Sequence, residues 1–496
     1  MLPRPSLHPN YRPDIDGLRA VAVLSVVGFH AFPQFIRGGF IGVDIFFVIS
    51  GYLISTILFE NLQHDRFSLV QFYSRRIRRI FPALLLVLIS VLVFGWFALF
   101  ANEYQQLGKH VAGGAAFISN YLFWGESGYF DTEAITKPLL HLWSLGIEEQ
   151  FYIVWPVILW LGWRLKANLL VMTLCFALVS FGLNFYGIRH DVVATFYSPQ
   201  TRFWELLSGS LLAWLMVFRP AARDRAVARV DGWLARIVGH QKAGRSENLL
   251  SFTGLLLVAG GIAVFHHGLS FPGMRALIPV LGAVLIIAAG AESWLNRTIL
   301  SSRILVWFGL ISYPLYLWHW PILSLATTIE GENLSPVIVA AALLLAVVLA
   351  WLTFRWLERP IRYNFFSGYI ACYLIALLSV TGIVGYMINS EILKVAGSSE
   401  KQKFLDHFEN SFPKWQYFSK INLNKEWRSE CAFIDTEKLQ KNGFLEGGII
   451  NSKPIKQLDS NCYKRNKSFE KSVLVWGDSH AQALSPGLVL LMPKNW

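Results

Sequence analysis

Eleven apolar stretches constrain this chain of 496 residues more than any other feature. A spanning helix needs roughly 20 predominantly apolar residues, and each stretch approaches that length. With 54% hydrophobic and only 15% charged residues, the composition excludes an ordinary water-soluble protein. The predicted spans are residues 17–36, 39–60, 80–101, 139–163, 168–187, 202–219, 249–266, 275–292, 304–325, 335–357 and 367–389.

The sequence therefore predicts an all-α polytopic membrane protein. About ten of its transmembrane helices belong to one domain over residues 10–360, and an eleventh, residues 367–389, links that domain to a polar C-terminal segment. The stretch 102–138 is expected to be an outer loop with room for a half-inserted segment. Membrane lipid is the solvent for most of the chain.

Basic residues predict the topology. The net charge is +12, but the arginines lie between the apolar spans, so nucleic acid is not the expected partner. If the N-terminus is cytoplasmic, the arginine-rich segments 66–79 and 219–245 are also cytoplasmic, as the positive-inside rule requires. Eleven crossings then place the C-terminal segment on the opposite side.

Two cysteines lie in that polar C-terminal segment. In an oxidising compartment Cys431 and Cys462 are candidates for a disulfide bond. No spacing typical of metal ligands occurs anywhere in the chain, so we expect no metal ion.

The first span carries an arginine and a histidine on one face. Arg19 and His30 are eleven positions apart, or about 16 Å along a helix axis. That spacing suits a ligand with phosphates at the inner surface and an extended arm, the shape of coenzyme A. Alternatively, Arg19 only snorkels to the interface and His30 is a satisfied polar residue. Asp44 is expected at a similar depth, where it could orient His30 or only pair with Arg37.

The fourth span contains ionisable groups, which are costly in lipid and therefore functional candidates. Four of its residues share one helical face: His141, Ser144, Glu148 and Tyr152. Glu148 is preferred over Glu149 because of that face, although Glu149 could reach the same cavity from a tilted helix. The structural alternative is a buried network of these carboxylates with Arg202 or Arg355.

The ninth span carries an aromatic cluster with a histidine. Its members are Tyr313, Tyr316, His319 and Trp320. Such rings could stack on the faces of sugars, or they could form an ordinary interfacial belt. A substrate-binding role for this cluster, together with His141, is the functional prediction.

Four arginines precede the third span: Arg75, Arg76, Arg78 and Arg79. They could serve only as topology determinants. They could also bind the phosphates of a nucleotide-like donor, for which planar guanidinium groups are well suited. The two roles are compatible.

Several of these motifs together resemble the membrane acyltransferase 3 family, especially members fused to a periplasmic SGNH domain that O-acetylate lipopolysaccharide O-antigen. The resemblance covers roughly residues 10–390 and rests on the segments 14–20 and 42–52, on His30, and on the arginine, His141 and Tyr313 motifs. It implies a bacterial inner membrane location, with the N-terminus cytoplasmic and the C-terminus periplasmic.

The resemblance also implies roles for individual residues. His30 would be catalytic, acetyl-CoA the acyl donor, Arg19 and the arginine cluster its binding residues, and an exported polysaccharide or lipid-linked glycan the acceptor. We expect His30 to act as a general base or to be transiently acetylated, with Asp44, Glu148 or Glu149 assisting.

The C-terminal part resembles the beginning of an α/β SGNH domain. Residues 390–471 form a predicted periplasmic extension, and Gly477, Asp478 and Ser479 in the segment 472–496 match the nucleophile motif. The later residues that such a site needs do not come after it, so we expect a truncated and inactive remnant. The alternative function for the whole chain is a proton-coupled transporter or a flippase-like membrane protein.

Overall fold

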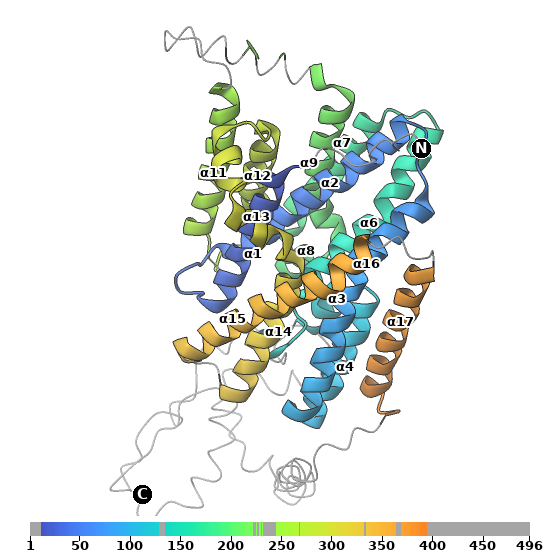
Figure 1. Cartoon of the computed structure of the whole chain (residues 1–496), viewed down its shortest axis with the longest axis vertical. Helices are drawn as coiled ribbons and strands as arrows, with labels where there is room; N and C mark the ends of the chain where they lie inside the picture. The colour runs from blue at the N-terminus through green and yellow to red at the C-terminus, as the bar shows by residue number, and fades with distance from the viewer. Residues whose placement is uncertain are drawn as a thin grey trace, which may run out of the picture. The chain divides into compact units, whose positions relative to one another are not determined.

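A computed structural model of the chain describes residues 11–127, 134–221, 245–266, 268–331, 334–363 and 369–393, with single residues at 225, 228, 229 and 231 (Figure 1). The predicted cysteine pair, the SGNH-like motif and most of the loop at 220–248 lie outside these residues. These three features remain predictions.

Within the described ranges every regular element is a helix, as the apolar periodicity predicts. The α-helices are α1 (Pro13–Ala31), α2 (Gly42–Gln63), α3 (Leu69–Ala98), α4 (Ala101–Ala115), α5 (Ser119–Glu126), α6 (Leu142–Arg164), α7 (Leu169–Gly187), α8 (Val192–Tyr197), α9 (Pro199–Phe218), α11 (Arg245–Val264), α12 (Leu277–Ala289), α13 (Arg303–Leu310), α14 (Ser312–Glu330), α15 (Pro336–Leu352), α16 (Arg359–Tyr363) and α17 (Tyr369–Asn389). Short 3₁₀ turns are η1 (Gly39–Ile41), η2 (Ala134–Thr136) and η3 (Gly273–Ala276), and π-helical turns are η4 (Asn296–Leu300) and η5 (Thr353–Glu358).

Every predicted span overlaps a helix, and the all-α membrane class is confirmed. Six helices in the described part of the chain are long and apolar enough to cross a membrane. The ninth predicted span is interrupted, because α13 ends at Leu310 and α14 begins at Ser312. The predicted loop at 102–138 was wrong in part, since α4 and α5 occupy much of it and α4 packs against α17 and α3.

Helix ends follow local chemistry. Proline at the first helical position begins α1, α9 and α15, where its fixed backbone angle fits and its missing N–H is not needed. The side chain of Ser68 accepts a hydrogen bond from the Gln71 backbone N–H and so caps α3. Asp14 in the first turn of α1 accepts from Arg12 and from Asn296 of η4, which fixes the start of the helix that carries Arg19 and His30.

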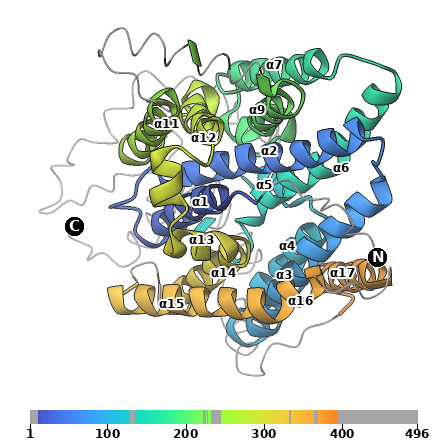
Figure 2. The same cartoon turned by 45° about the horizontal axis from the view of Figure 1, so that its top comes forward.

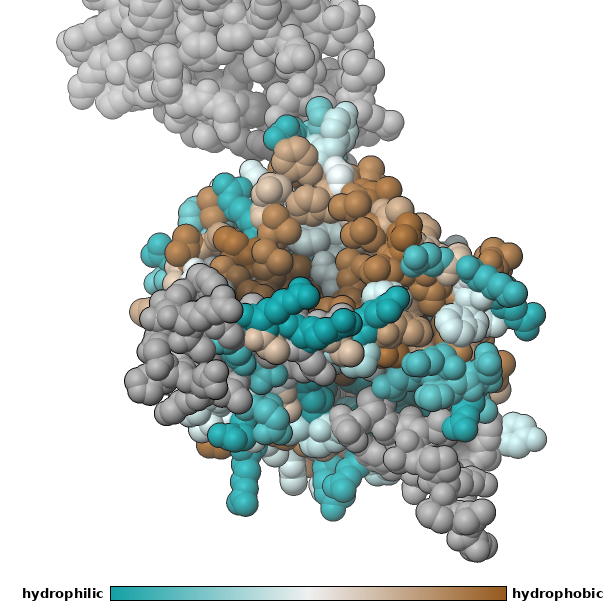
Figure 3. Space-filling view, turned by 90° about the horizontal axis from the view of Figure 1, so that it is seen from above, coloured by the Kyte–Doolittle hydropathy of each residue, from teal (hydrophilic) through white to brown (hydrophobic). Residues whose placement is uncertain are grey.

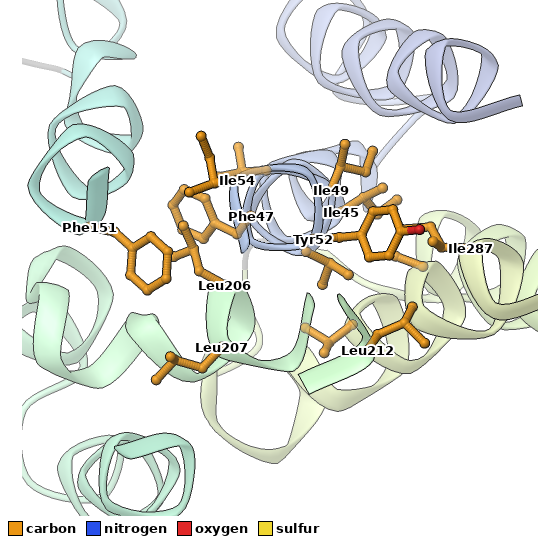
Figure 4. Close-up of a cluster of buried hydrophobic side chains, with 14 of the residues drawn as sticks. Ile45, Phe47, Ile49, Tyr52, Ile54, Phe151, Leu206, Leu207, Leu212 and Ile287 are labelled. Atoms are coloured by element: carbon orange, nitrogen blue, oxygen red, sulfur yellow. The ribbon is translucent and has the colours of Figure 1, made fainter. Parts of the chain in front are cut away.

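Helix α2 is the centre of the largest core. It packs against α9, α12, α1 and α6, and Figure 2 shows it running between α9 and α12 on one side and α1 on the other. The apolar side chains of α2 interdigitate with those of α9, α6 and α12 (Figure 4). The labelled members are Ile45, Phe47, Ile49, Tyr52, Ile54, Phe151, Leu206, Leu207, Leu212 and Ile287.

Two glycines let α2 and α9 approach closely. A Cβ atom at Gly51 would lie 1.8 Å from the carbonyl oxygen of Leu206, and one at Gly209 would lie 2.1 Å from that of Val48. No side chain fits at either position. Small residues of this kind bring helix backbones together in membrane proteins, where dispersion contacts replace the hydrophobic effect between helices.

The outer faces of several helices expose large apolar side chains, as a lipid-facing surface requires. Val179 of α7, Leu344 of α15 and Val380 of α17 are 62%, 66% and 57% exposed. Extended hydrophobic areas beside groups of hydrophilic residues are visible on the face drawn in Figure 3. The chain is therefore a multi-pass membrane protein.

A charged triad lies buried in the contact between α2 and α9. Nη2 of Arg202 is 3.0 Å from Oδ1 of Asp44, and Nε is 3.0 Å from Oε1 of Glu205. All three residues are at most 1% exposed. The guanidinium also lies within 6 Å of the ring centroids of four aromatic residues, Phe47, Trp143, Phe196 and Phe271. Arg202 thus supplies the one positive charge beside two buried carboxyl groups.

We predict that Arg202→Leu lowers the free energy of unfolding by about 3–5 kcal/mol, because it leaves two buried carboxylates without a counter-charge. Replacing all three members, as Asp44→Asn, Arg202→Leu and Glu205→Gln, should recover most of that loss. Thermal unfolding in detergent measures both. A triple variant no more stable than Arg202→Leu would show that the charges do not compensate one another.

Candidate functional site

A cavity of about 80 Å³ lies between α1, α2, α3, α6 and α14. This volume is smaller than the roughly 300–1,000 Å³ typical of small-molecule sites. Its ionisable wall residues are Arg19, Arg76, Arg79, Glu148, Glu149, Tyr152, Tyr313 and Tyr316, and its apolar wall comes largely from Val43, Phe46, Phe47, Ile49, Leu53 and Ile54 of α2. Seven of the fourteen site residues predicted in the membrane domain therefore meet in one place.

Three of the five arginines predicted to bind the donor line the cavity. Arg19 reaches it from α1, where its Nη1 is 3.0 Å from Oδ1 of Asp16. Arg76 and Arg79 reach it from the first turns of α3, and the Arg76 guanidinium lies 5.1 Å from the centroid of the Tyr152 ring. Arg75 and Arg78 are not among the lining residues, and Arg75 is exposed. Positions three apart on a helix share a face, as Arg76 and Arg79 do. Arg75 and Arg79, four apart, share a face by the same rule, so spacing alone does not give this division.

The two glutamates of α6 face the same cavity. Oε1 of Glu148 accepts hydrogen bonds from Ser50, at 2.5 Å, and from Tyr152. Glu149 is 6% exposed, and its Oε1 has no hydrogen-bond partner among the described residues. Neither glutamate pairs with Arg202, so the buried network considered from the sequence is not the one observed.

Two tyrosines of α14 close the inner part of the cavity. Tyr313 donates to the carbonyl oxygen of Ile80 at 2.9 Å. The hydroxyl of Tyr316 lies 2.6 Å from Ser144 Oγ and 2.9 Å from the His141 carbonyl oxygen. Both tyrosines were predicted to bind substrate together with His319 and Trp320, but they line the cavity with the arginines instead.

His30 belongs to a second group of aromatic residues, which does not line the cavity. Its Nδ1 is 2.9 Å from Nε2 of His319, and its ring lies 4.4 Å from that of Trp320. His141 lies between the two groups, with ring centroids 5.8 Å from His319 and 5.4 Å from Tyr316. Steps of 5–6 Å between rings thus connect the cavity wall to His30.

Asp44 does not orient His30, contrary to the sequence-based expectation. Its described partner is Arg202, and Arg37 donates instead to the backbone oxygen of Gln34. The sequence predicted only the depth of Asp44 in the membrane. It did not predict which neighbouring helix the side chain of Asp44 faces. His30 instead shares a hydrogen bond with His319, which the sequence placed only within an aromatic cluster.

A cluster of charges that sequence reasoning missed supports the His30 group. Glu126 at the end of α5 binds Lys109 (2.8 Å), His110 (2.9 Å) and Lys137 (3.1 Å). The carbonyl oxygen of Lys137 accepts a hydrogen bond from the Trp320 indole N–H at 2.8 Å. The three partners are eleven or more positions from Glu126 along the chain. The packing of α4 against α5 brings Lys109 and His110 to it, and Lys137 reaches it from the segment after η2. The cluster therefore positions the ring that lies against His30.

Comparisons with known proteins bear on this arrangement. A protein-family profile described as acyltransferase domain matches residues 12–355. The chain is 32% identical to the putative peptidoglycan O-acetyltransferase YrhL of Bacillus subtilis, covering 95% of this chain and 76% of the relative. It is 33% identical to the peptidoglycan O-acetyltransferase OatA of Listeria monocytogenes, covering 79% and 65%, and 33% identical to the O-acetyltransferase OatA of Staphylococcus aureus, covering 73% and 59%. No solved structure matches the chain.

The chain thus spans somewhat less than two thirds of the length of two of these relatives. Two of the three names specify peptidoglycan, and none mentions lipopolysaccharide. The O-antigen acceptor expected from the sequence therefore finds no support among them.

The charge cluster makes stability depend on pH. Burial by itself raises the pKa of Glu126, but hydrogen bonds and charge from His110, Lys109 and Lys137 outweigh it and lower the pKa well below the ordinary 4.5. A carboxylate with a depressed pKa stabilises the fold above its unfolded-state value and loses that contribution as the pH falls.

We therefore predict that Glu126→Gln lowers the thermal unfolding temperature at pH 7 and flattens its decline between pH about 5 and about 3. Thermal scans in detergent across that range measure the effect, with the exposed Glu330→Gln as a matched control. A decline of unchanged steepness in Glu126→Gln would contradict the role of this cluster.

Proposed function

Because the chain belongs to this family of acyltransferases, we propose that it transfers an acetyl group from cytoplasmic acetyl-CoA across the membrane to a hydroxyl group of an exported glycan. The observation that carries the proposal is the pairing of two sites. One is a cavity with Arg19, Arg76 and Arg79 in its wall, and a line of aromatic rings connects that wall to the other, His30. A single-compartment enzyme would have no use for that separation.

The cavity suits a donor with phosphate groups. Arg19, Arg76 and Arg79 present guanidinium groups to one space, and such groups bind phosphate through paired, charge-assisted hydrogen bonds. The apolar wall from α2 suits the uncharged arm of the donor.

The chemistry needs a base at the far end of the path. In direct transfer, His30 takes the proton of the acceptor hydroxyl group while the hydroxyl oxygen forms the new bond to the acetyl carbon. The thioester C–S bond breaks, and the proton passes from His30 to the leaving thiolate. In the two-step alternative, a His30 nitrogen forms the bond to the acetyl carbon as the thiolate leaves. The acceptor oxygen then displaces the nitrogen, and its hydroxyl proton passes through the freed nitrogen to the thiolate. Both routes use a lone pair of His30.

The acceptor that we propose is a peptidoglycan hydroxyl or that of a related surface polysaccharide. The names of two relatives specify peptidoglycan. Such a polymer lies outside the cytoplasmic membrane, so the His30 group would face outward and the arginine-lined cavity inward. The excess of arginine between the spans on the cavity side supports this orientation.

The test is acetyl transfer by the full chain reconstituted in liposomes, with labelled acetyl-CoA and peptidoglycan fragments. We predict a labelled ester, and a donor KM raised at least tenfold in Arg76→Gln and Arg79→Gln, because a charge-assisted hydrogen bond contributes about 1.5–3 kcal/mol. Arg75→Gln is the matched control, since its side chain is exposed outside the cavity, and its donor KM should stay near that of the wild type.

Two outcomes would contradict the proposal. If the wild-type chain forms no ester on any glycan offered, the proposed acetyl transfer is wrong. Equal donor KM values in Arg75→Gln, Arg76→Gln and Arg79→Gln would show that the donor does not bind in this cavity.

A further inference from the structure

The rings of His30 and His319 meet edge to edge. Their planes differ by only 13° and their centroids are 5.2 Å apart, while Nδ1 of His30 and Nε2 of His319 are 2.9 Å apart. Nearly coplanar rings with so short a contact between nitrogens share an in-plane hydrogen bond. One of these two nitrogens must donate a proton and the other must accept it.

The backbone of α14 decides which nitrogen donates. Nδ1 of His319 lies 3.1 Å from the carbonyl oxygen of Leu315, one helical turn earlier. A carbonyl oxygen can only accept, so Nδ1 of His319 carries the proton. In a neutral imidazole the other nitrogen is then the acceptor, which makes Nε2 of His319 the acceptor and Nδ1 of His30 the donor.

We propose that His319 is a positioning residue that holds His30 in the Nδ1–H tautomer and so leaves the reactive lone pair on Nε2 of His30. The effect of His319 on catalysis rests on the proposed function, but the tautomer of His30 follows from the contacts of α1 with α14 alone. An isolated histidine exchanges between both tautomers, and a base with the wrong nitrogen protonated cannot take a proton from the acceptor.

The surroundings of His319 favour this role over contact with a sugar. His319 is completely buried, so its ring faces are not available for stacking on a substrate. Trp320 lies against His30 at 4.4 Å and is itself held by the Lys137 carbonyl oxygen, which restricts rotation of the His30 ring. Asp44, the other candidate for orienting His30, is bound to Arg202.

During transfer the same contact remains in place. When Nε2 of His30 takes the proton from the acceptor hydroxyl, Nδ1 keeps its own proton and continues to donate it to His319. The proton on Nε2 then leaves to the thiolate, and the original tautomer is restored. His319 neither gains nor loses a proton in this cycle, so it positions His30 without touching the reacting atoms.

The first experiment reads the tautomer directly. In the full chain labelled with ¹⁵N-histidine, the nitrogen shifts of His30, assigned by their loss in His30→Gln, should show a protonated Nδ1 and an unprotonated Nε2. In His319→Phe the His30 signals should move to a mixture of tautomers, while the exposed His266→Phe should leave them unchanged. A protonated Nε2 in the wild type, or unchanged signals in His319→Phe, would overturn the proposal.

The second experiment measures the effect of His319 on acetyl transfer. We expect His319→Phe to lower kcat by about 10²- to 10⁴-fold, the range seen when a base loses its orienting partner. The donor KM should not change, because His319 does not line the cavity. His319→Gln retains an oxygen that can accept from His30 and should recover most of kcat. A rise in donor KM without loss of kcat, or no recovery in a folded His319→Gln, would contradict the role.

These readouts separate the inference from the function on which it depends. If the wild-type chain transfers no acetyl group but shows the expected His30 tautomer, the proposed function fails and the assignment of the ring pair stands. If it transfers acetyl groups with the opposite tautomer, the function stands and the role of His319 fails.

Discussion

The ion pair between Arg202 and Asp44 fixes the helix on which the rest of the site depends. A buried carboxylate in this setting must find a cation, and Arg202 of α9 supplies it. Once Asp44 faces α9, the rotation of α2 is determined. Ser50 lies six positions later, about 120° around the helix at 100° per residue, and therefore faces away from α9 toward Glu148. One buried contact thus directs the opposite face of α2 into the cavity.

Much of this arrangement could be predicted from the sequence, because helical periodicity shows which side chains lie on the same face of a helix. The eleven apolar stretches correspond to helices, and the i, i+4 spacing of Ser144, Glu148 and Tyr152 correctly placed all three on one surface. The same rule places Arg79 on a shared face with both Arg75 and Arg76, so it does not show which of these arginines line the cavity. Contacts between helices could not be predicted, since periodicity contains no information on which neighbour a face meets. Asp44, His319 and Glu126 all have partners more than ten positions away.

The separation of the cavity from His30 has a consequence for the transfer itself. Tyr316 and Ser144, joined by a hydrogen bond of 2.6 Å, stand at the inner wall of the cavity, and His141 and His319 lie beyond them. An acetyl group carried on an extended arm must pass this wall to reach His30. His141 is 3% exposed, and neither of its ring nitrogens has a hydrogen-bond partner among the described residues. The carbonyl oxygen of a passing acetyl group could therefore form a hydrogen bond with His141.

In the proposed mechanism, donor and acceptor meet from opposite sides of the membrane. The most direct test uses sealed, inverted membrane vesicles with labelled acetyl-CoA outside and a glycan acceptor trapped within. The mechanism predicts a labelled ester on the trapped glycan, with none on the same glycan supplied outside together with the donor. Acetylation only where donor and acceptor share a compartment would contradict it.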